Sequence, residues 1–226
     1  ASTIFGVGAV FANIIGMTNQ QGSIFLASFT IANVVMQYPI GRMSDRFDRR
    51  LVILIVASIS GLAAAIASIV GLSNYWTLLG LAAIFGGFSM TIYSLCIAHA
   101  NDYLSPSQMV GTASALITVN GIGAIFGPPI IAALVDLFGS YMFFAMLSAV
   151  HIGLGLFVLA RMYMREAVPA EAQGPFIAVP DQGTAVAASL NPETAWSELD
   201  PELVATEDPL TDNPYLDMPS LQKPSK

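Results

Sequence analysis

The chain of 226 residues is too apolar and carries too little charge to be a soluble globular protein. Hydrophobic residues make up 55% of it and charged residues 10%, with a mean hydropathy of +0.68, whereas soluble chains are about 25% charged. The net charge is −7, and the chain has no cluster of basic residues of the kind that nucleic-acid binding needs. Its single cysteine, Cys96, excludes an intrachain disulfide and a cysteine-based metal cluster.

Six apolar stretches follow one another along residues 1–163. A helix needs about 20 apolar residues to cross the hydrocarbon core of a membrane, and backbone exposed to lipid must be helical. The stretches are residues 1–16, 22–40, 51–73, 75–98, 109–135 and 141–160. The first opens inside an apolar run, and we expect it to be a helix that lacks its first turns. The sequence therefore predicts an all-α membrane protein, built as a six-helix transmembrane bundle.

The placement of arginine predicts the orientation of this bundle. Two clusters, one after the second stretch and one after the last, contain every arginine: Arg42, Arg46, Arg49, Arg50, Arg161 and Arg165. Four stretches separate the clusters, so both fall on one side of the membrane, and cytoplasmic loops carry the excess of Lys and Arg. We therefore expect a multi-pass protein of the bacterial inner membrane with a cytoplasmic C-terminus.

The composition changes abruptly after the last stretch. Residues 1–165 hold six arginines and four aspartates, a net +2, whereas residues 166–226 hold eleven acidic residues and two lysines, a net −9. A segment this polar and acidic cannot bury enough apolar surface to offset the entropy of ordering. Residues 164–226 are therefore predicted to form a disordered acidic cytoplasmic tail.

The loop between the second and third stretches carries the most specific pattern in the chain. It reads Gly41-Arg42-Met43-Ser44-Asp45-Arg46-Phe47-Asp48-Arg49-Arg50. This resembles motif A of the major facilitator superfamily, usually written G-x-L-[GAS]-D-R-x-G-R-R. Asp48 replaces the second Gly of the motif, so a positive-φ turn is not expected there. The preceding Gln37-Tyr38-Pro39-Ile40 resembles the YcaD-type subgroup.

The chemistry of this loop suits a latch. Gly41 allows backbones to approach closely, and Asp45 and Arg49 can pair across one turn if the loop is helical. Asp45 can also meet the positive end of a neighbouring helix, while Arg46 and Arg50 can reach lipid phosphates. The resemblance implies that the cluster gates the cytoplasmic face by latching two halves together; the alternative is an arginine cluster that only fixes orientation. The members of the motif are Gly41, Arg42, Asp45, Arg46, Arg49 and Arg50.

A second pattern lies in the fifth stretch. Gly121-Ile122-Gly123-Ala124-Ile125-Phe126-Gly127-Pro128-Pro129 resembles the G-x-x-x-G-P pattern called motif C. Gly123 and Gly127 are four residues apart and permit close helix packing. Pro128 and Pro129 remove two backbone donors, so a bent helix is predicted. The alternative is a plain packing face.

Six spans are half of a twelve-helix major facilitator fold, in which motif A can follow the second or the eighth span. The N-terminal half of such proteins usually carries an arginine in its fourth span, and residues 75–98 have none. The end of this span, from Tyr93 to Asp102, resembles the tenth span of YcaD-type members. The resemblance therefore implies spans 7–12, with the missing N-terminal half as partner.

Uncharged polar residues within the stretches are candidates for the lining of a solute cavity, because each is costly in lipid. The resemblance implies that Asn13, Gln37, Tyr93 and Asn120 lie on spans that line such a cavity; the alternative for each is a hydrogen bond between helices.

Three further polar residues have other expected roles. His99 and Asp102 lie at the cytoplasmic mouth, where a gating or pairing role competes with simple solvation. His151 lies in the middle of the last stretch and is expected to be a hydrogen-bonded structural histidine.

The resemblance implies a secondary active transporter of a small solute, embedded in the lipid bilayer and working by alternating access. The sequence has no G-x-S-x-G, H-E-x-x-H or P-loop pattern, so we expect no enzyme, metal or cofactor. If transport is coupled to protons, the residues belong to the missing half, because no stretch contains a carboxylate. The alternative is a non-transporting scaffold or sensor that recruits partners through its acidic tail.

Overall fold

The structure is a computed structural model and describes residues 2–70, 73–103, 106–164, 173–174 and 176. Within the helix that begins at Pro106, the side chains of residues 106–111, 113 and 114 are outside the description. The predicted acidic tail, residues 164–226, lies almost wholly outside the described residues.

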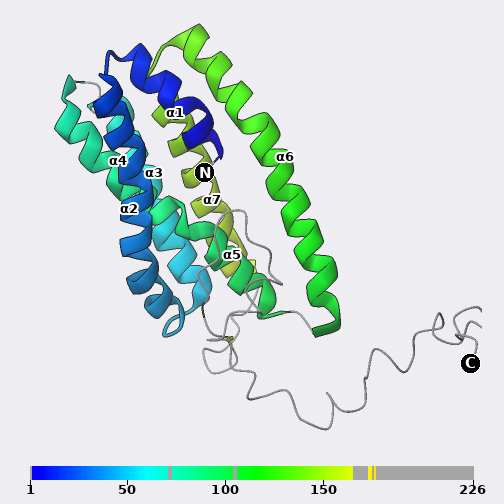
Figure 1. The fold of residues 1–226 in the computed structure, drawn as a ribbon. Coiled ribbons are helices and arrows are strands. Elements are labelled where there is room, and N and C mark those ends of the chain that lie inside the picture. Colours follow the sequence, from blue (N-terminus) through cyan, green and yellow to red (C-terminus); the bar gives the residue numbers. More distant parts are fainter. Residues whose placement is uncertain (1, 71–72, 104–105, 165–172, 175, 177–226) are drawn as a thin grey trace, which may run out of the picture. The chain divides into compact units, whose positions relative to one another are not determined.

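The described part of the chain is helical (Figure 1). Its helices are α1 (Ser2–Ile14), α2 (Asn19–Ser44), α3 (Arg49–Ile69), α4 (Tyr75–Ser89), α5 (Thr91–Asn101), α6 (Pro106–Phe138) and α7 (Met142–Met164). Five helical stretches are long and apolar enough to cross a membrane, with α4 and α5 counted together, and α1 is shorter. The predicted all-helical membrane bundle is confirmed.

Polar residues at the helix ends determine where the helices begin. Thr18 and Gln21 form a reciprocal capping box at the start of α2, and the side chains of Asp48 and Asn74 cap α3 and α4. Each cap satisfies backbone N–H groups that have no partner inside the helix. Positive φ angles occur at Gly16 (78°) and Gly139 (107°), where the chain reverses between α1 and α2 and between α6 and α7.

The fourth predicted span is two helices joined at Met90. Met90 is both the last cap of α4 and the first cap of α5, and its N–H still bonds to the Gly86 carbonyl. The Thr91 hydroxyl donates to the Gly87 carbonyl at 3.0 Å, a local bond of the kind that perturbs helix geometry. The break places α5 at the end of the bundle where the arginine loop lies, as the contacts below show.

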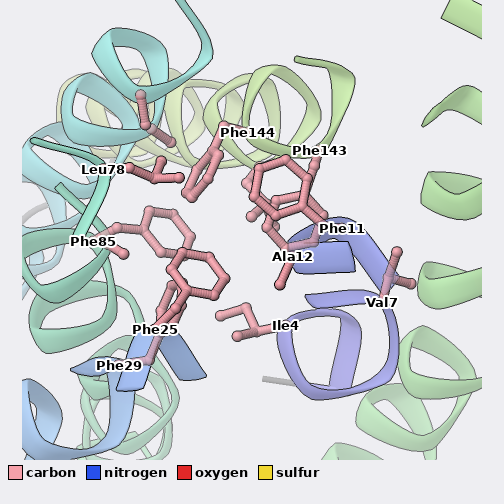
Figure 2. Packing of buried hydrophobic residues seen from close by; sticks show 14 of the residues in the cluster. Ile4, Val7, Phe11, Ala12, Phe25, Phe29, Leu78, Phe85, Phe143 and Phe144 are labelled. Atoms are coloured by element: carbon pink, nitrogen blue, oxygen red, sulfur yellow. The ribbon is translucent and has the colours of Figure 1, made fainter. Parts of the chain in front are cut away.

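The largest core cluster is a set of phenylalanine rings from four helices, shown in Figure 2. Its fully buried rings are Phe11, Phe25, Phe29, Phe85, Phe143 and Phe144. Phe11 stacks on Phe143 with ring centroids 4.5 Å apart, and Phe25 meets Phe29 edge-on at 5.0 Å. Such pairs add about 0.5–1.5 kcal/mol each beyond the burial of their area, so this cluster holds α1, α2, α4 and α7 together.

Helix α6 is the least buried of the long helices. It packs against α1 and α7 (Figure 1), yet several large apolar side chains on it are exposed. These include Val119, Ile122, Ile125, Phe126 and Leu137. An apolar surface of this extent needs lipid or another protein to cover it, which agrees with a membrane helix that has neighbours on one side only.

Close packing of α2 against α4 depends on Gly86. A Cβ added there would lie 2.5 Å from the Cα of Phe29 and 2.9 Å from its carbonyl oxygen, whereas a Cβ on Gly80 would meet nothing within 4 Å. Because both obstacles are backbone atoms, the helices would have to separate. We expect Gly86→Ala to lower the free energy of unfolding in detergent by about 1–3 kcal/mol.

The matched control is Gly80→Ala, in the same helix, which we expect to be neutral or stabilising by up to about 1 kcal/mol. Equal effects of the two substitutions would contradict the close approach.

Candidate functional site

A buried ion pair lies at the centre of the candidate site. Arg49, the first residue of α3, donates through Nη1 to both carboxylate oxygens of Asp102, at 2.7 and 2.8 Å. The two side chains are 1% and 2% exposed. Arg49 also donates through Nε to the Ser44 hydroxyl at 3.0 Å. The pair therefore joins the end of α2, the start of α3 and the end of α5.

Burial and the charge of Arg49 have opposite effects on the pKa of Asp102. Burial disfavours the charged carboxylate and raises the pKa of Asp102 above its ordinary value, and the positive charge of Arg49 offsets only part of that effect. The sequence is compatible with either a paired or a solvated Asp102, and the structure shows it paired. Its expected neighbour His99 is half-buried and meets Tyr103 edge-on, with ring centroids 5.3 Å apart.

Asp45 is the exposed member of this site. It follows α2 as its C-terminal cap, and its side chain is 42% exposed. The segment from Asp45 to Asp48 is a turn and not a helix, and the expected pair of Asp45 and Arg49 forms without a hydrogen bond. Asp45 Oδ1 lies 3.9 Å from Arg49 Nη2, an ionic contact too long for a hydrogen bond.

Asp48 caps α3 and holds Arg50. Its carboxylate accepts hydrogen bonds from the backbone N–H of Arg50 at 3.0 Å and from Nη2 of the same residue at 3.0 Å. Its φ is −52°, which agrees with the expectation of no positive-φ turn. Burial raises the pKa of Asp48, but the hydrogen bonds from Arg50 outweigh it and leave the pKa below its ordinary value.

The remaining arginines of the motif face outward. Arg46 is exposed, and Arg42 is exposed while donating to the Tyr38 hydroxyl at 3.1 Å. Gly41 is buried. The loop thus contains a buried ion pair with its hydrogen-bonding partners and two exposed arginines, Arg42 and Arg46. Exposed arginines of this kind can meet lipid phosphates.

A cavity of about 530 Å³ opens between the α4–α5 stretch, α6 and α7. Its polar lining consists of Ser2, Ser89, Tyr93, Cys96, Asn120 and His151. No carboxylate, lysine or arginine is among the described residues that line it. Of the four predicted cavity residues, the structure brings Tyr93 and Asn120 together here. Asn13 is exposed on α1 and Gln37 is half-buried on α2, and neither lines this cavity.

His151 is hydrogen-bonded, as expected. It also lines the cavity, a location that the sequence did not predict. Its Nδ1 lies 2.7 Å from the Leu147 carbonyl and its Nε2 lies 2.7 Å from the Ser89 hydroxyl. A carbonyl only accepts, so Nδ1 carries a proton, and in the neutral ring Nε2 then accepts from the Ser89 hydroxyl. The only signal in the sequence was that Ser89 and His151 are both polar residues within apolar stretches.

The glycines of the motif C resemblance differ in their surroundings. A Cβ on Gly127 would lie 2.9 Å from the Thr3 hydroxyl oxygen of α1, whereas one on Gly123 would meet nothing within 4 Å. Close packing is therefore seen at Gly127, while Gly123 lines a second cavity of about 460 Å³. α6 continues as one helix through Pro128 and Pro129, and the bend stays a prediction.

The fold and this site define a multi-spanning helical bundle with a charged loop at one end. Residues 1–206 match the family model described as Major Facilitator Superfamily, and the chain belongs to that superfamily. The resemblance found in the arginine loop is thereby confirmed.

The chain is similar to curated proteins named "Uncharacterized MFS-type transporter YcaD". Over 165 residues it is 25% identical to the one from Escherichia fergusonii and 27% identical to the one from Escherichia coli strain UMN026. Each match covers 73% of this chain and 41% of the relative. The chain thus spans about two-fifths of the length of these relatives.

Removal of Arg49 should be strongly destabilising, because it leaves the Asp102 carboxylate buried without its counter-charge. We expect Arg49→Ala to lower the free energy of unfolding by about 3–5 kcal/mol, measured by chemical unfolding in mixed micelles. Arg46→Ala, which removes an exposed charge from the same loop, should change it by no more than about 0.5 kcal/mol. Similar losses in the two variants would contradict the buried pair.

The lowered pKa of Asp48 makes its contribution to stability pH-dependent. Its contribution is present above its ordinary pKa of 3.8 and is lost as the pH falls through the lower pKa of the folded state. Asp48→Asn keeps a capping side chain but loses the charge that holds Arg50. We expect it to be less stable at pH 7 by up to about 1 kcal/mol.

This difference should close as the pH falls from about 5 to about 2, when Asp48 becomes protonated. Unfolding curves of both proteins across this range provide the measurement, and a difference independent of pH would contradict the assignment.

Proposed function

We propose that this chain is the C-terminal half, spans 7–12, of a secondary transporter that moves a small solute across a bacterial inner membrane by alternating access. Membership of the superfamily and the names of the relatives support transport. The match to two-fifths of the relatives' length supports a partner half. In this proposal the arginine loop and the C-terminus face the cytoplasm, and the chain acts without catalysis, metal or cofactor.

The observation that carries the proposal is the cavity between helices that are long and apolar enough to cross a membrane. It is bounded by three long helical stretches and combines apolar walls with a few uncharged polar groups, the composition expected of a small-molecule site. Tyr93, Asn120 and the Ser89–His151 pair would offer hydrogen bonds to a solute. Asn13 and Gln37, which lie outside this cavity, would face the solute only across the boundary with the other half.

The latch role is proposed for the loop that contains Asp45. Arg49 and Asp102 fix the loop to α5, so that the ends of α2, α3 and α5 move as one body. Asp45 remains exposed and can accept a hydrogen bond from an approaching segment. Breakage of such a bond when the cytoplasmic side opens would couple the loop to the cavity.

Proton coupling, if the transporter uses it, requires a titratable carboxylate at membrane depth. The six predicted stretches contain none, and Asp136 lies only two residues before the end of α6. The carboxylate would therefore belong to the other half. The family match and the relatives' names favour transport over a scaffold that acts through the acidic tail.

Alternating access has a test that needs no knowledge of the solute. Gly121 lines the cavity, and a side chain there would meet nothing within 4 Å. We expect a cysteine in Gly121→Cys, in the full-length protein without other cysteines, to react with a membrane-impermeant maleimide added from either side. A rocking transporter exposes its cavity to both sides in turn.

The control is Leu62→Cys, on α3, whose side chain is 61% exposed outside the cavity. Because that position would face lipid, it should react from neither side. Labelling of Gly121→Cys from one side only would contradict alternating access.

A further inference from the structure

A short piece of chain beyond α7 lies on the arginine loop. Gly174 and Phe176 are twelve or fewer residues past the end of α7 at Met164, and both contact the buried ion-pair site. We call this set of interactions the tail contact. It involves the backbone of Gly174 together with the backbone N–H and ring of Phe176.

The backbone half of the tail contact uses the charged groups of the site. Arg49 Nη2 donates to the Gly174 carbonyl at 2.7 Å, and the Gly174 N–H donates to Asp102 Oδ1 at 3.2 Å. The same buried arginine and carboxylate that pair with each other thus also hold both polar groups of one peptide residue. Hydrogen bonds to charged groups are about twice as strong as neutral ones.

Asp45 supplies the third backbone bond. Its Oδ1 accepts the Phe176 N–H at 2.7 Å, and this is the group that stands exposed at the edge of the loop. Any other donor that approaches the same oxygen must share it with Phe176 or displace it. The tail contact therefore occupies the residue that the latch proposal makes available to the other half.

The aromatic ring of Phe176 fills a space that a glycine leaves open. It packs against the second core cluster, which contains Ile40 and Val52. A Cβ built on Gly41 would lie 2.8 Å from Cε1 and 3.3 Å from Cγ of the ring. A larger residue at position 41 would exclude the ring, so Gly41 serves the tail contact in addition to backbone packing.

We propose that the arginine loop carries a binding notch for the chain's own C-terminal segment, and that the tail contact regulates the latch by competing for Asp45. The notch consists of Gly41, Asp45, Arg49 and Asp102, and its occupant is Gly174 with Phe176. This proposal rests on the proposed function, because the competitor at Asp45 is the other half of the transporter. Release of the tail contact frees Asp45 and favours closure of the cytoplasmic face.

A disulfide test reports the docking itself. The full-length protein would carry Gly41→Cys and Phe176→Cys in a background without other cysteines. Because the Phe176 side chain lies against the space above Gly41, the two sulfurs should reach disulfide geometry. We expect mild oxidation in membranes to link the pair, as detected by mass spectrometry. The control pair, Gly121→Cys with Phe176→Cys, should not link, and failure of the first pair would overturn the notch.

A second measurement reports the regulation. Phe176→Ala, introduced into the Gly121→Cys protein, should reduce maleimide labelling from the cytoplasmic side relative to the other side by at least about threefold, the effect of losing one typical anchoring interaction. Phe47→Ala removes an exposed ring from the same loop and should leave the ratio unchanged.

The outcomes separate the two proposals. A disulfide with an unchanged labelling ratio would overturn the competition for Asp45 and leave the notch as a structural tether. Two-sided labelling of Gly121→Cys without the disulfide would overturn the notch and leave the transporter proposal standing. One-sided labelling, with or without the disulfide, would overturn the transporter proposal.

Discussion

The buried guanidinium of Arg49 is the constraint on which this end of the bundle depends. A charge with 1% of its side chain exposed is tolerated only when it is paired and its donors are bonded. Its partners come from four places in the chain: the Ser44 hydroxyl, the Asp102 carboxylate, the Gly174 carbonyl and, at longer range, Asp45. Satisfaction of one side chain therefore fixes the ends of α2, α3 and α5 and the segment beyond α7 with respect to one another.

Away from this end, the bundle satisfies its polar groups without charge. The Ser148 hydroxyl donates to the Gly61 carbonyl at 2.8 Å between α7 and α3, and Ser89 bonds to His151 at 2.7 Å between α4 and α7. Neutral pairs of this kind avoid the cost of a charge at membrane depth. They also leave the described lining of the cavity with hydrogen-bonding groups but no fixed charge, so an ionic solute would need its counter-charge from elsewhere.

The sequence predicted the class of fold and the location of the loop, because both depend on local patterns. Long uncharged runs identify membrane helices by length alone, and Gly41 to Arg50 is a contiguous motif. The partner of Arg49 was not predictable in the same way, since Asp102 is 53 residues away and spacing does not reveal which helix ends meet. The motif predicted a role for Asp45 but not the turn that keeps it from bonding closely to Arg49.

The lining of the cavity was likewise predictable only where it depends on local sequence patterns. Tyr93 and Asn120 were recognisable as polar residues in apolar helices, but the choice among Asn13, Gln37, Tyr93 and Asn120 required the packing of α6. Ser89 and His151 were missed as lining residues because each looks like an ordinary helix residue until its neighbour is known. Of the predicted acidic tail, residues 164–226, the structure describes only Met164, Gln173, Gly174 and Phe176.

The surroundings of α6 show which of its glycines permit close packing, which the motif alone does not show. A glycine that permits close packing has a neighbouring atom where a Cβ would lie, as Gly127 has in Thr3. At Gly123 that space is open and borders a cavity. Together with the exposed apolar side chains of Ile122, Ile125 and Phe126, this indicates a helix that contacts its own bundle along one side only. A helix that borders the cavity and contacts its own bundle along one side only is suited to move relative to α1 and α7.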